Sequence, residues 1–322
     1  VKTQKKIEST TVSGDCAVVL VIDVSSSMMY NESGSQKCNV PTAQQRITAA
    51  KAAAVNFINN YINGAGGARR MISVVAFSKN ASTVVGWTDA AQGDNAAAVI
   101  NAINSLTSTV GTNIEGGLML AKNLISLTGS GQALEGFTQS MKNVVMLSDG
   151  QPTRRVSSSA NTSSLTLITG TTSSSSSDKI QAEAQATTVK SLARLYTVAF
   201  STNSSTSAWL ASISSPNSAF TADNADSLML SFEQISQELE LAANAGSVTD
   251  PMGLYINFSS AYNAASNGFS LTDNQSTRYF NTADNTIIWK LSDEVYTESS
   301  SGSVTYYTYR LNYQISLDAA AI

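Results

Sequence analysis

The sequence predicts an α/β fold, a doubly wound and mostly parallel sheet, accompanied by a smaller β-rich module. Apolar runs without alternation recur along the first 245 residues, and such runs are typical of strands buried on both faces. Segments with helical spacing separate these runs, and strands that alternate with helices favour a parallel sheet covered on both faces. After Asn244 the apolar residues alternate with polar ones instead, which indicates half-buried antiparallel strands.

The expected strands of the α/β part are short runs rich in Val, Ile, Leu and Met. In chain order they are Cys16 to Val24, Met71 to Phe77, Thr83 to Trp87, Asn143 to Leu147, Leu195 to Phe200 and Ala219-Phe220. The third of these follows the second after only a few residues, so we expect a hairpin across Lys79-Asn80-Ala81.

Between the strands, apolar residues recur every three or four positions, as they do on one face of a helix. The expected helices are Thr42 to Ile62, Asn95 to Leu106, Ile114 to Leu127, Asp178 to Leu192, Ser207 to Ile213 and Ala225 to Asn244. Asn63-Gly64 ends the first helix, as is common at a helix C-terminus.

These elements divide the chain into an α/β domain over residues 15–245 and a β-rich module over residues 246–322, which we interpret as incomplete. Residues 1–14 are expected to supply a strand of the same β module. The alternating run from Tyr306 to Leu317 is the clearest strand of that module.

A segment rich in Ser and Thr, at about residues 152–177, interrupts the α/β domain and ends in five consecutive serines. Because this composition buries little apolar surface, one interpretation is a mobile linker. The alternative, which we favour, is a partly ordered surface arm in which Leu165 to Ile168 form a short strand.

Composition excludes several classes of function. The 322 residues carry a net charge of −4 without a basic cluster, and no histidine is present. Nucleic-acid binding is therefore not expected, and a Ser-His-Asp triad, a histidine-ligated zinc and a histidine general base are excluded. No apolar run reaches about 18 residues, so no membrane insertion is expected. We do not expect an enzyme.

The two cysteines leave their redox state open. Cys16 begins the first strand, and Cys38 lies in the loop that leaves the far end of that strand. The strand spans roughly 23 Å, whereas a disulfide needs Cα atoms within about 7 Å. A bridge forms only if the loop folds back along the domain, so free thiols and a disulfide both remain possible.

Five oxygen-bearing side chains form the candidate site. They are Asp23, Ser25, Ser27, Thr112 and Asp149. Both aspartates follow expected strands, and ligands of parallel sheets bind at the carboxyl ends of the strands. Carboxylate and hydroxyl oxygens suit Mg, Ca or Mn, and Mg is favoured because it is held by one or two carboxylates and keeps its waters. A shell that the protein leaves incomplete can accept a carboxylate from a partner, which indicates adhesion.

Three motifs carry a family resemblance: Val21-Ile-Asp-Val-Ser-Ser-Ser-Met28, Gly111-Thr-Asn-Ile-Glu-Gly-Gly-Leu118 and Met146-Leu-Ser-Asp-Gly150. They resemble the metal-ion-dependent adhesion site of a von Willebrand factor type A domain, whose sheet is Rossmann-like. The resemblance implies that the three hydroxyls offer direct or exchangeable ligands. It also implies that Asp23 and Asp149 act partly through water.

The segment Val248-Thr-Asp-Pro-Met252 resembles the exit of this domain in tip adhesins of Gram-positive, sortase-assembled pili. That resemblance implies an Ig-like β module and a place outside the bacterial cell, on a pilus or the cell wall. The implied partners are a host matrix or cell-surface protein, whose binding would serve virulence, and other pilus subunits. Two alternatives stay open: a structural pilus or stalk component with a stabilising metal, and a module of an intracellular metal-insertion or ATPase complex.

Overall fold

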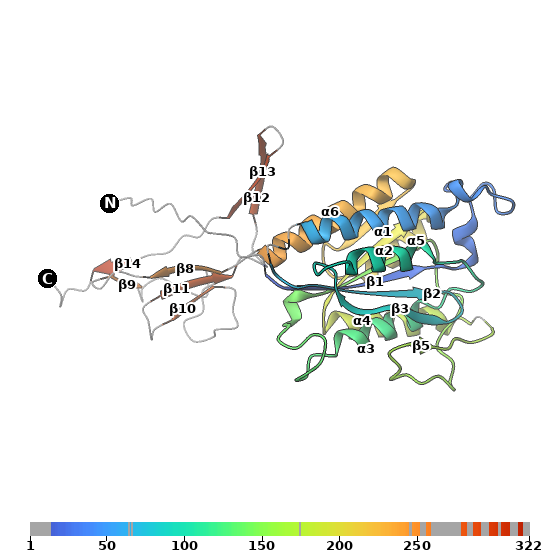
Figure 1. Ribbon diagram of the computed structural model, residues 1–322, viewed down its shortest axis with the longest axis horizontal. Helices are drawn as coiled ribbons and strands as arrows, with labels where there is room; N and C mark the ends of the chain where they lie inside the picture. Colours follow the sequence, from blue (N-terminus) through green and yellow to red (C-terminus); the bar gives the residue numbers. More distant parts are fainter. Residues whose placement is uncertain are drawn as a thin grey trace. The chain divides into compact units, whose positions relative to one another are not determined.

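One seven-stranded sheet organises the α/β part of the chain, with the strand order β5-β3-β2-β1-β4-β6-β7 (Figure 1). The computed structural model describes residues 14–63, 65, 67–173 and 175–244, and seven short strands between residues 247 and 317. The chain divides into two compact units, the first of which runs from Ser13 to Glu240. The strand expected in residues 1–14 falls on residues that, except for Gly14, lie outside this description.

The sheet is mostly parallel, as predicted. Its strands are β1 (Cys16–Asp23), β2 (Arg70–Phe77), β3 (Ala81–Asp89), β4 (Lys142–Ser148), β5 (Leu167–Ile168), β6 (Arg194–Phe200) and β7 (Ala219–Ala222). Strand β1 lies parallel to both β2 and β4, and β6 and β7 continue the parallel order beyond β4. Strand β3 alone runs in the opposite direction: it pairs antiparallel with β2, with which it forms the predicted hairpin, and with β5 on its other side. The strand order therefore reverses at β1, which is where parallel sheets bind ligands.

Burial explains why the central strands lack alternation. Every residue of β1, β2 and β4 is buried. Val19 and Val21 of β1 belong to the core cluster that also contains residues of α3, α4 and α5. Since successive side chains of a strand point to opposite faces, the intervening β1 residues face the other helix layer, and both faces require apolar side chains.

Six α-helices are present among the described residues. They are α1 (Arg46–Asn63), α2 (Asn95–Asn104), α3 (Ile114–Ile125), α4 (Ser177–Lys190), α5 (Ser204–Ile213) and α6 (Ala225–Asn244). Figure 1 shows α1, α2 and α6 over one face of the sheet and α3 and α4 over the other. Phe57 of α1 and Phe232 of α6 meet edge to face with their ring centroids 5.9 Å apart. Helix α5 contributes Trp209, Leu210 and Ile213 to the apolar cluster that α3 and α4 form with the sheet, hereafter the α3–α4 core.

The first helix begins later than the sequence predicted. Thr42–Gln44 forms a short 3-10 turn after Pro41, and Gln45 is extended with φ −77° and ψ 143°. This extended residue interrupts the helical backbone, so α1 starts at Arg46 rather than at Thr42. The remaining helix and strand bounds of the α/β part agree with the predictions to within a few residues.

The Ser/Thr-rich segment contacts the edge of the sheet and α3. Ile168 is fully buried in the α3–α4 core, and Leu167–Ile168 forms β5 against β3. The Asn123 side chain on α3 donates to the carbonyls of Thr162 and Ser164 at 2.9 and 2.8 Å. Residues 152–173, hereafter the arm, are therefore attached to the edge of the sheet and to α3 by the buried Ile168 and by hydrogen bonds.

Both cysteines are free thiols, and Cys16 is buried whereas Cys38 is exposed. The loop that carries Cys38 does not return along β1, so the geometric condition for a bridge is not met.

The second unit contains only short antiparallel pairings among its described residues. Its strands are β8 (Ser247–Pro251), β9 (Ile256–Phe258), β10 (Arg278–Asn281), β11 (Thr286–Lys290), β12 (Tyr296–Ser301), β13 (Val304–Tyr309) and β14 (Ile315–Leu317). Strand β11 lies between β10 and β8, β13 pairs with β12, and β14 pairs with β9. The described parts of the predicted run from Tyr306 to Leu317 lie in β13 and β14 and pair with different strands, and residues 310–314 between them lie outside the description.

None of the described helices combines the length and the apolar character that a membrane-crossing helix needs.

Replacement of Gly170 by alanine is expected to loosen the arm. A Cβ at this position would collide with the carbonyl oxygen of Lys79, and the Gly170 N–H donates to Asn80 Oδ1 at 2.9 Å. We expect a loss of about 1–3 kcal/mol in the free energy of unfolding and faster hydrogen exchange in the arm. Gly86→Ala is the matched control on β3, because a Cβ there meets nothing within 4 Å. Equal exchange rates in the two variants would contradict this attachment.

Candidate metal centre

The site begins where β1 ends. Asp23 is the last residue of β1 and is fully buried. Its Oδ1 accepts the backbone N–H of Ser25 at 2.8 Å. Its Oδ2 accepts the hydroxyl of Ser148, the last residue of β4, at 2.7 Å. The parallel pairing of Ile22 with Leu147 makes these two strand ends neighbours, so the carboxylate is held in place from both strands.

A chain of hydroxyls leads from Asp23 to the second aspartate. Ser25 Oγ and Ser27 Oγ are 3.0 Å apart, and the Ser27 hydroxyl donates to Asp149 Oδ1 at 2.7 Å. Ser27 belongs to a short 3-10 turn, Ser26–Met29, which follows β1 after two residues. Four of the five predicted residues thus converge, although Ser27 and Asp149 are 122 positions apart in the sequence.

Thr112 joins the group through its main chain. Its carbonyl accepts the N–H groups of Thr153 and Arg154 at 2.9 and 3.1 Å, and its N–H donates to Thr153 Oγ1 at 3.1 Å. These bonds attach the Thr112 loop to the loop that follows Asp149. Nearby, Ser25 and Thr109 form an isolated parallel bridge. The three loops of the predicted site are therefore mutual neighbours.

The two neighbours of Thr112 in the sequence fix its position. Gly111 has φ +90°, which favours glycine, and a Cβ there would approach the Lys79 backbone at 3.1 Å. Asn113 is the N-cap of α3, and its side chain accepts the Gly116 N–H at 2.9 Å. Thr112 is therefore held immediately outside the helix, with only 7% of its surface exposed.

The electrostatics of the site favour a cation. Burial, and after it the charge of Asp149, raise the pKa of Asp23 to about 7, although hydrogen bonds from Ser148 and Ser25 oppose the shift. Burial also raises the pKa of Asp149, although the hydrogen bond from Ser27 and the charge of Arg46 oppose the shift. Two neighbouring buried carboxylates repel each other, and positive charge between them would relieve that repulsion.

The donor set fits a hard divalent cation. Within the described part of the chain, no three or more Asp, Glu, Cys or His side chains gather as a metal cluster. A metal at this site would instead combine two carboxylates with hydroxyl oxygens, all of which are hard ligands of the kind that Mg²⁺ accepts.

Two partners at the site were missed by the sequence analysis. Ser148 Oγ binds Asp23, and Arg46 Nη1 donates to Asp149 Oδ2 at 2.9 Å. The prediction placed Arg46 inside a helix rather than at its start. A basic first residue opposes the helix dipole, so the correct helix start would have marked Arg46 as unusual.

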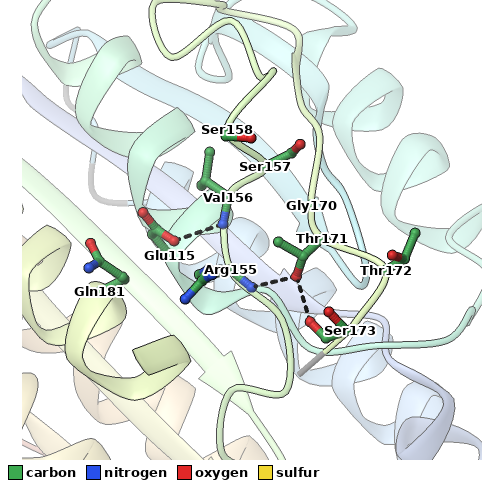
Figure 2. A pocket seen from close by; sticks show the side chains of 10 residues that line it. All are labelled: Glu115, Arg155, Val156, Ser157, Ser158, Gly170, Thr171, Thr172, Ser173 and Gln181. Atoms are coloured by element: carbon green, nitrogen blue, oxygen red, sulfur yellow. Dashed lines mark hydrogen bonds between the residues drawn. The ribbon is translucent and has the colours of Figure 1, made fainter. Parts of the chain in front are cut away.

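A polar cavity of about 460 Å³ lies between the arm, α3 and α4. Figure 2 shows Glu115 of α3 on one side, with its Oε2 accepting the Val156 N–H at 2.7 Å. On the other side, the Thr171 hydroxyl donates to the Ser173 carbonyl at 2.8 Å. Burial raises the pKa of Glu115, and the bond from Val156 and the charge of Arg155 oppose this. Since Arg154 contacts Thr112 and Arg155 lines the cavity, the cavity lies beside the loops of the site.

A family model matches part of the chain. Residues 18–151 match the model of the von Willebrand factor type A domain, and this range includes all five predicted site residues. The chain contains a von Willebrand factor type A domain. Among curated proteins, no sequence matches the chain.

Three solved structures of other proteins share the fold. The pilus adhesin SpaC from Lactobacillus rhamnosus GG matches with TM-score 0.54 and 18% identity over 76% of this chain and 33% of that one. The PilB minor pilin from Streptococcus sanguinis matches with TM-score 0.54 and 17% identity over 72% and 63%. The vWF domain of the type V pili tip protein Mfa5 from Porphyromonas gingivalis matches with TM-score 0.56 and 16% identity over 74% and 99%. The chain thus spans about a third of SpaC and under two thirds of PilB, and the likeness concerns the fold.

The metal-free domain is expected to lose stability as the pH rises from about 4 to about 7. The folded chain keeps the Asp23 proton to about pH 7, whereas an unfolded chain releases it near pH 4. Within this window the folded state binds more protons, so the free energy of unfolding falls with rising pH. Urea unfolding in EDTA measures the slope, and Asp23→Asn should flatten it. Stability that increases across this range would contradict the assigned environment of Asp23.

Proposed function

We propose that this von Willebrand factor type A domain is the head of a cell-surface adhesin that binds a host or matrix protein through a divalent cation, with Mg²⁺ favoured. The observation that carries the proposal is the hydrogen-bonded convergence of Asp23, Ser25, Ser27 and Asp149 at the reversal point of the sheet. The neighbouring Thr112 loop supplies the fifth residue.

Each residue has a distinct part in this proposal. Ser25, Ser27 and Thr112 would offer hydroxyl oxygens directly, whereas Asp23 and Asp149 would act partly through water. The aspartate oxygens already accept hydrogen bonds from Ser148, Ser27 and Arg46, which lowers their capacity to neutralise an ion. The bound cation would supply an electron-poor centre that attracts a carboxylate of the partner protein.

The arm and its cavity border this centre, and we propose that they help to select the partner. The arm is attached to the Thr112 loop at Thr153 and Arg154, so a protein docked at the cation would reach it. The cavity presents hydroxyls, the Glu115 carboxylate and the Arg155 guanidinium, which suits polar groups on the partner.

A non-catalytic role is supported by the chemistry of the chain. The sequence contains no histidine, and the described carboxylates of the site are committed to hydroxyl and guanidinium donors. SpaC is described as a pilus adhesin, PilB as a minor pilin and Mfa5 as a pilus tip protein. This common context supports a position outside the bacterial cell, on a pilus or the cell wall, with other pilus subunits as further partners.

The flanking segments complete the proposed arrangement. We propose that residues 1–14 and 246–322 form one β-rich, Ig-like stalk module. The short antiparallel pairings of β8, β10 and β11 and of β12 and β13 are compatible with such a module.

Removal of the metal, or of Asp23, is expected to abolish adhesion. Binding to fibronectin, collagen or host cells should fall at least ten-fold in EDTA and in Asp23→Ala, because either change destroys the cation site. Asp15→Ala is the matched control: it removes a carboxylate at the opposite end of β1, where Asp15 pairs with Arg69 at 2.6 Å. Undiminished binding in EDTA and in Asp23→Ala would refute the proposal.

Thermal unfolding with Mg²⁺ and a test for ATPase association, added to the adhesion experiment, separate the two alternative functions. A structural stalk component would gain thermal stability with Mg²⁺ but bind none of the host proteins. A module of an intracellular metal-insertion or ATPase complex would associate with an ATPase partner and would not depend on host proteins.

A further inference from the structure

The pairing of Arg46 with Asp149 is the unusual feature of this site. Arg46 Nη1 lies 2.9 Å from Asp149 Oδ2, and the two side chains are 7% and 0% exposed. The other oxygen of the same carboxylate accepts the Ser27 hydroxyl. A fixed positive charge therefore contacts one of the five proposed metal-site residues and is shielded from solvent.

The guanidinium is held in place by the loop that precedes α1. Its Nε and Nη2 donate to the carbonyls of Asn31 and Glu32 at 3.2 and 3.4 Å. Gly34 has φ +69°, and a Cβ there would lie 2.9 Å from Arg46 Nη2, so the loop closes tightly over the guanidinium. Because its donors are occupied on several sides, Arg46 has little freedom to leave Asp149.

Stability alone gives a poor account of this arrangement. Arg46 is the first residue of α1, where the helix dipole disfavours a cation. Burying an ion pair also costs desolvation, so such pairs often contribute little net stability. The position of Arg46 is better explained by its effect on the charge of the site.

The charge balance shows what that effect would be. Metal binding releases the proton of a ligating carboxyl group, so at the loaded site Asp23 and Asp149 carry two negative charges, and Arg46 reduces the net charge of the three residues to −1. With a divalent cation the group would then carry +1, whereas without Arg46 it would be neutral. A site with residual positive charge holds its cation less tightly and attracts an incoming anion more strongly.

We propose that Arg46 weakens cation binding and strengthens binding of the partner carboxylate at the loaded site. This inference rests on the proposed function. It adds that the affinity for the cation is lowered and the affinity for the partner carboxylate is raised, which the five site residues alone do not specify. Arg46 acts by holding Asp149 and through the electrostatic field of its own guanidinium. It therefore positions a site residue and sets the charge of the site, but it is not a ligand of the cation.

The test uses Mn²⁺ as the cation and acetate as the carboxylate. Mn²⁺ binding is measured by electron paramagnetic resonance, and acetate binding by the fall in water-proton relaxation as acetate replaces water on the bound Mn²⁺. In Arg46→Gln and Arg46→Met we expect Mn²⁺ to bind on the order of ten-fold more tightly and acetate on the order of ten-fold more weakly. Arg46→Lys keeps the charge and should lie between these variants and the unmodified chain.

Arg69→Met is the matched control. Arg69 also pairs with an aspartate, Asp15, but at the start of β1, so its removal takes the same charge from a distant place. Both constants should be unchanged in this variant. Two neutral variants of different shape are included so that misfolding of one, checked by circular dichroism, leaves the other for the test.

The opposite signs separate this role from a purely structural one. If Arg46 only held Asp149 in position, its loss would weaken Mn²⁺ and acetate together, and that result would overturn the inference. Equal constants in the neutral variants and the unmodified chain would also overturn it. Either outcome leaves the proposed function intact, whereas failure of the unmodified chain to bind Mn²⁺ would remove both.

Discussion

The parallel pairing of β1 with β4 is the constraint on which the rest of the site depends. It sets Ile22 beside Leu147, so that Asp23 and the residues after β4 emerge at the same edge of the sheet. The two strands are buried along their whole length, and their packing between two helix layers fixes this register. Polar groups that are distant in sequence are therefore brought together by an apolar core that contains none of them.

The consequence is a concentration of negative charge that the core itself cannot stabilise. Burial raises the pKa of both aspartates, and the surrounding donors offset part of this cost. Those donors come from three places: the end of β4, the turn after β1 and the first residue of α1. The two buried carboxylates of such a site favour a bound cation. Because these carboxylates also accept hydrogen bonds from the protein, they would neutralise the cation only in part. A partly neutralised cation can bind the carboxylate of a partner protein, as the proposed adhesin requires.

Much of the fold could be predicted because its signals are local. The apolar run of β1 and the helical spacing of α6 specify their elements without reference to the rest of the chain. Asp23 and Asp149 could be placed together because both follow strands of one parallel sheet. The metal-binding role of the five residues stays a prediction.

The features that escaped prediction depend on contacts between distant segments. Arg46 meets Asp149 across 103 residues through a loop whose path has no periodic signal. The arm has a composition typical of linkers, yet the single buried residue Ile168 and the amide of Asn123 attach it to the sheet edge and α3. The Tyr306 to Leu317 run alternates throughout, but alternation does not specify which strand each part will pair with.

The central claim is that these loops bind one divalent cation and leave a coordination place for another molecule. A crystal structure of the chain grown with Mn²⁺ and acetate, with anomalous data, tests it most directly. One anomalous peak is expected among Ser25, Ser27 and Thr112, and acetate or water should complete the coordination of the Mn²⁺ ion there. A peak elsewhere, no peak, or an ion enclosed entirely by oxygens of the chain would contradict it.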